Sequence, residues 1–143
     1  MTRAETLAKA SKELMLAEPF YGLLLMSLNK KWSTDIPTAG VRLNGVNYEL
    51  IINPDFWDGL PPEQKIGILK HELLHIGFFH LINYNSYEDK QTLNIAMDLE
   101  INQYIERHML PKEGCFLDKY EDLELEERAG TKYYYNKLKE NSD

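Results

Sequence analysis

Five consecutive residues, His71-Glu72-Leu73-Leu74-His75, have the types and spacing that point most directly to chemistry. A helix turns ~100° per residue, so side chains four apart lie on one face, and His71 and His75 can both present a ring nitrogen to one zinc ion. Glu72 is offset beside them, where a carboxylate can hold and deprotonate a water molecule at the metal. We therefore expect His71 and His75 to be zinc ligands and Glu72 to be a catalytic general base. The competing interpretation is two histidines packed in a core helix.

A catalytic zinc site has three protein ligands and keeps a fourth position open, so one more ligand must come from downstream. His80 is one candidate. On a continuous helix it lies ~180° from His71 and faces away from the metal, unless the helix breaks near Gly77. Metzincin proteases break their helix at a glycine, but their histidine spacing is one residue longer. His80 is therefore kept as the alternative ligand; otherwise we expect it to be paired in the core or in contact with the next helix.

A second helix, predicted over about residues 92–109, offers carboxylates for the third position. Asp98 falls on its apolar face, where a buried and unpaired carboxylate would be costly but a metal would compensate the charge. Asn94 and Asn102 lie one turn on either side of it and could orient ligands. Glu100 falls on the opposite face and is expected to be solvated. We predict Asp98 as the third ligand of a Zn²⁺ site, which would also accept iron or manganese.

The elements that must position these residues can be predicted from apolar patterns and from proline and glycine. They are helices over 4–16 and 19–31, a loop over 32–40, a hairpin of strands 41–43 and 46–52 that turns at Asn44-Gly45, the motif helix over 60–82, the helix over 92–109, and a last helix near 133–138. The Asn-Gly pair is typical of a hairpin turn, because both residues accept positive φ. The motif helix is apolar almost all round, which indicates a buried central helix. The predicted fold class is α+β, with a small sheet beside that helix.

Size and charge limit the class of protein further. The chain has 143 residues and a net charge of −7, which argues for one domain, residues 1–143, and against broad binding to nucleic acids or anionic membranes. Within it, residues 1–37 would form the N-terminal helices and residues 38–138 the core that carries the motifs. The single cysteine, Cys115, permits no internal disulfide, and the apolar run 20–28 is too short to cross a bilayer and lacks the basic start of a secretory signal. We expect a cytoplasmic protein.

Several blocks of sequence are similar, in order, to those of a known group. They are Thr38-Ala-Gly-Val41, Leu50-Ile-Ile-Asn-Pro54, His71-Glu-Leu-Leu-His75, Asn94-Ile-Ala-Met-Asp98 with Ile101-Asn102, and Tyr135-Asn-Lys-Leu138. In these blocks the chain resembles the zincin metallopeptidases, and more narrowly the putative metallopeptidase domain of bacterial and phage proteins that is sometimes fused to a von Willebrand factor A-like domain.

The resemblance implies a zincin-like core in which an edge strand borders the active-site cleft. It maps His71 and His75 onto zinc ligands, Glu72 onto the catalytic glutamate and Asp98 onto the acidic position of the downstream helix. The chain leaves no room for a fused A-like domain, so we expect a function that depends on one to be absent or supplied by a separate protein partner.

The leading hypothesis is a zinc-dependent peptidase that acts on a peptide or protein held along one strand of the hairpin. The side chain that stabilises the oxyanion is left open among Tyr84, Tyr87, Tyr104 and His108. One alternative is a metal-dependent ribonuclease, against which Glu72 and the negative charge count. The other is a non-catalytic binding protein with a structural zinc, in which His80 and Asp98 would both coordinate and close the site.

Overall fold

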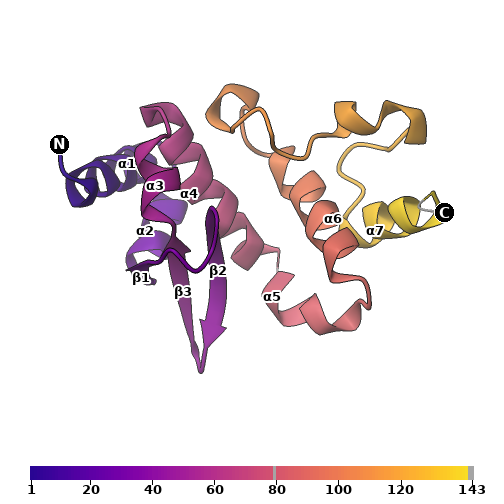
Figure 1. The fold of residues 1–143 in the computed structure, drawn as a ribbon, viewed down its shortest axis with the longest axis horizontal. Helices are drawn as coiled ribbons and strands as arrows, with labels where there is room; N and C mark the ends of the chain where they lie inside the picture. Colours follow the sequence, from indigo (N-terminus) through magenta and orange to yellow (C-terminus); the bar gives the residue numbers. More distant parts are fainter. Residues whose placement is uncertain (79, 142–143) are drawn as a thin grey trace.

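The computed structural model describes residues 1–78 and 80–141, which form helices around one three-stranded sheet. The helices are α1 (Arg3–Ala17), α2 (Pro19–Met26), α3 (Pro54–Asp58), α4 (Pro62–Gly77), α5 (His80–Asn83), α6 (Lys90–Asn102) and α7 (Thr131–Glu140), with short 3-10 helices η1 (Tyr84–Ser86), η2 (Arg107–Met109) and η3 (Leu117–Leu123). The strands are β1 (Asn29–Trp32), β2 (Ala39–Asn44) and β3 (Asn47–Ile52), in the order β1-β3-β2. This mixed architecture confirms the predicted α+β class (Figure 1).

The N-terminal segment contains a strand that the sequence analysis did not predict. α1 begins with a capping box between Thr2 and Glu5, and Pro19 separates it from α2, as the position of the proline predicts. The predicted helix over 19–31 is wrong in its second half, because α2 ends at Met26 and β1 then pairs in parallel with β3. Residues 1–37 are therefore not helical throughout. Asn29, Lys30 and Lys31 are all exposed, so β1 has no alternating apolar pattern that could identify it.

The hairpin forms as predicted, but its turn lies one residue further along the chain. Asn44 pairs with Asn47, which leaves Gly45 and Val46 as the two-residue loop. Gly45 takes the left-handed conformation with a φ of 68°, which glycine adopts without steric cost. Asn44 stays in β2, where its side chain donates a hydrogen bond to Glu49.

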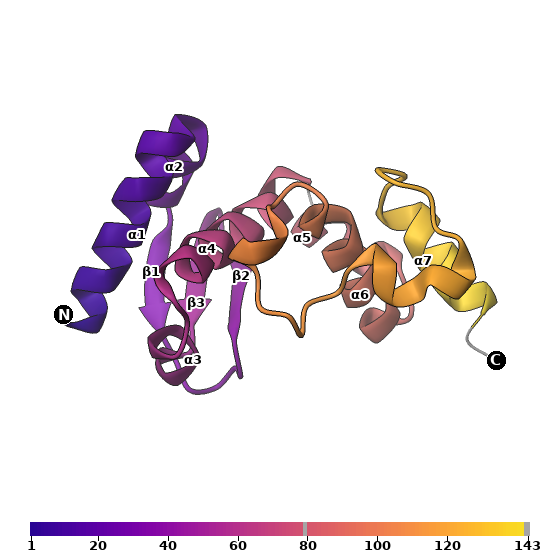
Figure 2. The same ribbon diagram turned by 90° about the horizontal axis from the view of Figure 1, so that it is seen from above.

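α4 lies at the centre of the molecule, as its nearly continuous apolar surface predicts. It begins at Pro62, where a proline in the first turn loses no helical hydrogen bond, and it contacts α1, α2, β2 and α6. Figure 2 shows α1 and α2 at one end of the molecule and α7 at the other, with α4 and α6 between them. The predicted single helix over 60–82 is wrong: α4 ends at Gly77, and α5 begins at His80. Phe79, which that prediction included, lies outside the described residues.

α6 is shorter than predicted and is followed by a turn. It ends at Asn102 instead of Met109, and η2 then packs back against α4. η2 can approach α4 this closely because Gly67 has no side chain. The Met109 carbonyl occupies the space that a Cβ atom at Gly67 would need. α7 packs on the other side of α6 through a cluster that includes Ala96, Leu99 and Tyr134. None of the described helices is long and apolar enough to span a membrane.

Candidate metal centre

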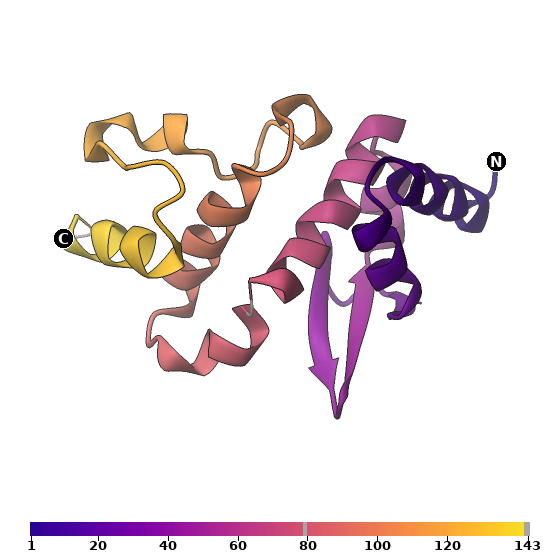
Figure 3. The same cartoon turned by 180° about the vertical axis from the view of Figure 1, so that it is seen from behind.

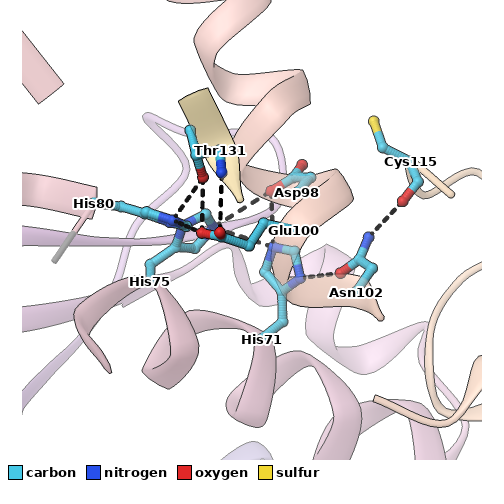
Figure 4. Close-up of polar contacts among 8 residues, drawn as sticks. All are labelled: His71, His75, His80, Asp98, Glu100, Asn102, Cys115 and Thr131. Carbon is cyan, nitrogen blue, oxygen red and sulfur yellow. Dashed lines mark hydrogen bonds and ion pairs between the residues drawn. The ribbon is translucent and has the colours of Figure 1, made fainter. Parts of the chain in front are cut away.

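The last turns of α4 and the middle of α6 bring three polar side chains together, as Figure 4 shows. His71 and His75 lie one turn apart on α4, and their Nε2 atoms are 3.3 Å from each other. The Oδ1 atom of Asp98 lies 3.2 Å from Nε2 of His71 and 3.4 Å from Nε2 of His75. The structure thus places Asp98 with the two histidines, in the position expected from the apolar face of α6.

These three atoms have the spacing that a metal site needs. Four ligands of tetrahedral zinc, with bonds of about 2.0–2.1 Å, are about 3.3–3.4 Å from one another. The three observed separations of 3.2, 3.3 and 3.4 Å describe one face of such a tetrahedron. Two imidazoles and one carboxylate are also a donor set that zinc accepts. His71, His75 and Asp98 could therefore hold a metal ion and leave a fourth position open.

Asn102, one turn after Asp98, fixes the orientation of the His71 ring. The Nδ2 atom of Asn102 donates to the Cys115 carbonyl over 2.9 Å, so its Oδ1 atom faces His71. His71 Nδ1 donates to that oxygen over 2.7 Å, which leaves Nε2 directed toward His75 and Asp98. This direct contact supports the predicted orienting role of Asn102. Asn94 lines the same cleft, but in the described part of the chain no hydrogen bond joins its side chain to the histidines or to Asp98.

The electrostatics of the site favour positive charge. Burial alone would lower the pKa of His71, but its hydrogen bond to Asp98 and the charges of Glu72 and Asp98 raise it to about 9. Burial would raise the pKa of Asp98, yet hydrogen bonds from His71 and His75 hold it well below its ordinary value. The carboxylate of Asp98 is thus ionised, and the pocket stabilises a cation beside it.

His80 contacts His75 but does not belong to the group formed by the three residues. Because α4 ends at Gly77, the chain turns His80 back toward His75, and their Nδ1 atoms are 2.9 Å apart. Its Nε2 atom is 2.8 Å from Oε1 of Glu100 on α6. His80 is therefore paired in the core and in contact with the next helix, and it is not part of the group that could bind a metal.

Glu100 is buried, and its expected exposure to solvent is wrong. Only 8% of its surface is exposed, because α7 and His80 cover the face of α6 on which it lies. Its carboxylate accepts hydrogen bonds from the amide and the hydroxyl of Thr131, at the start of α7, over 2.9 and 2.8 Å. The sequence does carry a signal for this burial, since Ala96 and Met97 precede Glu100 by four and three residues and make its helix face apolar. Thr131 lies far along the chain, and no local pattern indicates its contact.

Glu72 lines a cleft in front of the three metal-site residues. The cleft has a volume of about 970 Å³, and its lining residues include several from β2, α4 and α6. Figure 3 shows the ribbons of these three elements from behind. Glu72 is only 5% exposed, yet within the described residues no protein group hydrogen-bonds its carboxylate. Its charge acts on the neighbouring His71. A carboxylate in this position is available to a water molecule in the cleft.

Of the four side chains considered for the oxyanion, only Tyr84 lines this cleft among the described residues. The ring of Tyr87 packs on Tyr135, and that of Tyr104 packs on Phe78. His108 is mostly exposed and lies near Glu106.

β2 borders the cleft with a free edge, since the strand order is β1-β3-β2. In an antiparallel pair, every second residue directs its backbone N–H and C=O toward the partner strand. The Asn53 amide donates to the Thr38 carbonyl over 2.7 Å, one step beyond the paired register, so Thr38, Gly40 and Arg42 face β3. The residues whose backbone groups face the free edge are therefore Ala39, Val41 and Leu43.

Comparison with known proteins gives one match. The model of a family described as "Putative metallopeptidase domain" matches residues 2–141. No curated protein and no solved structure matches the chain.

Proposed function

The chain belongs to the putative metallopeptidase domain family, and from this we propose that it is a zincin-like, zinc-dependent peptidase that hydrolyses peptide bonds. One observation carries the proposal. The Nε2 atoms of His71 and His75 and the Oδ1 atom of Asp98 form a triangle with zinc-like spacing, in the same cleft as the unbonded carboxylate of Glu72.

In this proposal, each of the four residues has a distinct task. His71, His75 and Asp98 would hold the zinc ion, which when bound lowers the pKa of water and polarises the scissile carbonyl. Glu72 takes a proton from the attacking water and later gives it to the leaving amine nitrogen, a contribution of typically ~10²–10⁴-fold. Tyr84 is the best-placed side chain to donate a hydrogen bond to the oxyanion, since it lines the cleft.

The free edge of β2 suits a substrate in extended conformation. A peptide that adds to this edge would pair with the outward backbone groups of Ala39, Val41 and Leu43 and pass over the metal site. Pairing of this kind recognises backbone more than side chains, so we expect weak selectivity for sequence.

Two features of the site favour catalysis on peptides over the alternatives. A closed structural zinc site would need a fourth protein ligand, but both ring nitrogens of His80 are engaged by His75 and Glu100. The charged side chains of the cleft include the carboxylates of Glu72 and Asp98, which would repel the phosphates of RNA.

The test combines metal analysis with hydrolysis of an unfolded protein. We expect the purified wild type to bind one zinc per chain and to cleave that protein, with loss of cleavage on adding a chelator. Glu72→Gln should keep the zinc and lose activity by about 10²–10⁴-fold. Asp98→Ala should lose the zinc, and His80→Ala should still bind it at saturating concentration.

Glu63→Gln is the matched control, because Glu63 is exposed in the first turn of the same helix. It should behave as the wild type. Full activity of Glu72→Gln would contradict the mechanism, and cleavage of RNA in a parallel incubation would favour the nuclease alternative.

A further inference from the structure

A row of hydrogen bonds extends from His75 to the start of the C-terminal helix (Figure 4). His75 Nδ1 lies 2.9 Å from Nδ1 of His80, and His80 Nε2 lies 2.8 Å from Oε1 of Glu100. The Thr131 hydroxyl donates to the same oxygen over 2.8 Å, and the Thr131 amide donates to the other carboxylate oxygen over 2.9 Å. This row, His75–His80–Glu100–Thr131, joins four helices: α4, α5, α6 and α7.

A metal ion on His75 would fix every proton in the row. With Nε2 of His75 bound to the metal, the neutral ring carries its hydrogen on Nδ1 and donates it to Nδ1 of His80. His80 must then carry its own hydrogen on Nε2, which donates to Glu100. The ionised carboxylate only accepts, so it can end this series. Without the metal, only the hydrogen bond from His80 to Glu100 favours this arrangement of hydrogens.

The burial of the row makes its contacts costly to lose. His80 is 5% exposed and Glu100 is 8% exposed, so an unpaired nitrogen or carboxylate there would have little access to water. Glu100 also caps the N-terminus of α7. The N-cap residue, Gly130, has no side chain that could accept a hydrogen bond from the amides of the first turn, and Glu100 accepts one from the Thr131 amide.

We propose that His80 and Glu100 are positioning residues for His75, and that through Thr131 they couple metal binding to the docking of α7 on α6. The inference rests on the metal site of the proposed function. Coupling between two sites is reciprocal, so metal should tighten the Glu100–Thr131 contacts at the start of α7, and loss of these contacts should weaken metal binding.

The first test measures zinc affinity by competition with a chelator of known affinity. Glu100→Ala should weaken binding by about 10–100-fold, as is usual for a residue that supports a metal ligand. Thr131→Val should weaken it in the same direction by about tenfold or less, whereas Thr131→Ser keeps the hydroxyl and should restore affinity. The comparison of Thr131→Val with Thr131→Ser tests the proposal even if Glu100→Ala does not fold.

Tyr135→Phe is the matched control for a merely loosened α7. The Tyr135 hydroxyl accepts a hydrogen bond from the Asp89 amide at the start of α6, away from His75. Its removal weakens the attachment of α7 without touching the row, so zinc affinity should stay at the wild-type value. An equal loss of affinity in Tyr135→Phe and Thr131→Val would contradict a specific role for the row.

The second test follows amide hydrogen exchange of α7 with and without zinc. In the wild type and in Tyr135→Phe, zinc should slow exchange in the first turn of α7; in Thr131→Val the effect should shrink. Unchanged exchange on adding zinc would overturn the coupling while the metal site stands. A wild type that binds no zinc would contradict the proposed function and the coupling together, and a zinc-bound protein without peptidase activity would contradict only the function.

Discussion

At the scale of single residues, the site depends on side chains that each make two directed contacts. Asn102 is the clearest case, because its amide group donates to the Cys115 carbonyl and its oxygen accepts from His71. The carbonyl decides which way the amide points, and the amide decides which ring nitrogen of His71 faces the cleft. The loop that carries Cys115 thereby takes part in the metal site without supplying a ligand.

Replacing Asn102 should weaken both metal binding and the stability of the fold. In Asn102→Ala, the His71 ring loses the acceptor that fixes its orientation, and we expect zinc affinity to fall by about 10–100-fold in a chelator competition. The Cys115 carbonyl also loses its donor, at a cost of about 1–3 kcal/mol to the free energy of unfolding. Asn94→Ala is the control, since Asn94 flanks Asp98 on the other side but has no such contact. Equal losses in both variants would contradict the orienting role.

The sequence predicts residues whose direction follows from the face of their own helix, and misses residues whose surroundings depend on the packing of distant segments. His71, His75 and Asp98 come together as expected, because spacing on α4 and the apolar face of α6 determine where they point. Glu100 was expected in solvent because it lies on the face of α6 opposite Asp98, although Ala96 and Met97 make that face apolar as well. Only the packing of α7 and the return of the chain at His80 bury it.

At the scale of elements, the residues at which α4 and α6 end determine how the following segments fold back on them. α4 stops at Gly77, which lets His80 return to His75, and α6 stops at Asn102, which lets η2 fold back on α4. The sequence predicted both helices but extended both too far, since apolar residues continue past each end. β1 was missed for the opposite reason: hydrogen bonds to β3 hold it at the sheet edge, and its side chains show no apolar alternation.

Because η2 lies close to α4 at one point, alanine substitutions at two glycines of α4 should differ in their effect on stability. In Gly67→Ala, the added methyl group would overlap the Met109 carbonyl, and we expect the free energy of unfolding to fall by about 1–3 kcal/mol or more. Gly77→Ala is the control, because nothing lies near its Cβ position, so it should be neutral or stabilising by up to about 1 kcal/mol. Urea unfolding of both variants checks this, and equal stability of the two would contradict the packing.

Asp89 caps the N-terminus of α6, and its carboxylate makes the free energy of unfolding depend on pH in acid. Hydrogen bonds from Thr92 hold the pKa of Asp89 at about 2, below its ordinary value of 3.8. The ionised cap therefore stabilises the fold fully above about pH 4, and this stability is lost as the pH falls through about 2.

Asp89→Asn tests this response, since an asparagine caps the helix but does not titrate. The difference in the free energy of unfolding between wild type and variant should be constant above about pH 5 and should change, to the disadvantage of the wild type, as the pH falls toward 3. A difference that stays constant over the whole range would show that the cap does not titrate as described.

At the scale of the whole molecule, the candidate metal site lies where two packed regions meet. One region surrounds α4 and the sheet, and the other is formed by α6 and α7 around Tyr134. Each region contributes to the three-residue group, two histidines from α4 and one aspartate from α6. The α+β class could be predicted from the order of the elements. The packing of α7 on α6 could not, because it depends on contacts between distant parts of the chain.

The cleft between these regions predicts how a substrate is held. In Val41→Pro, one outward N–H of β2 is removed while the pairing with β3 is kept, because proline is tolerated where the edge N–H faces solvent. We expect KM for an extended peptide to rise, with the zinc content unchanged. Val41→Ala keeps the N–H and is the control, so a similar rise in KM for both variants would point to the side chain and contradict backbone pairing.

An open strand edge can accept only a chain whose own amide and carbonyl groups are unpaired. In a stable native protein most of these groups are paired internally, so unfolded chains and exposed extended segments would enter the cleft most readily, with little dependence on their sequence. Conformation of the target, and not a recognition sequence, would then decide what is degraded.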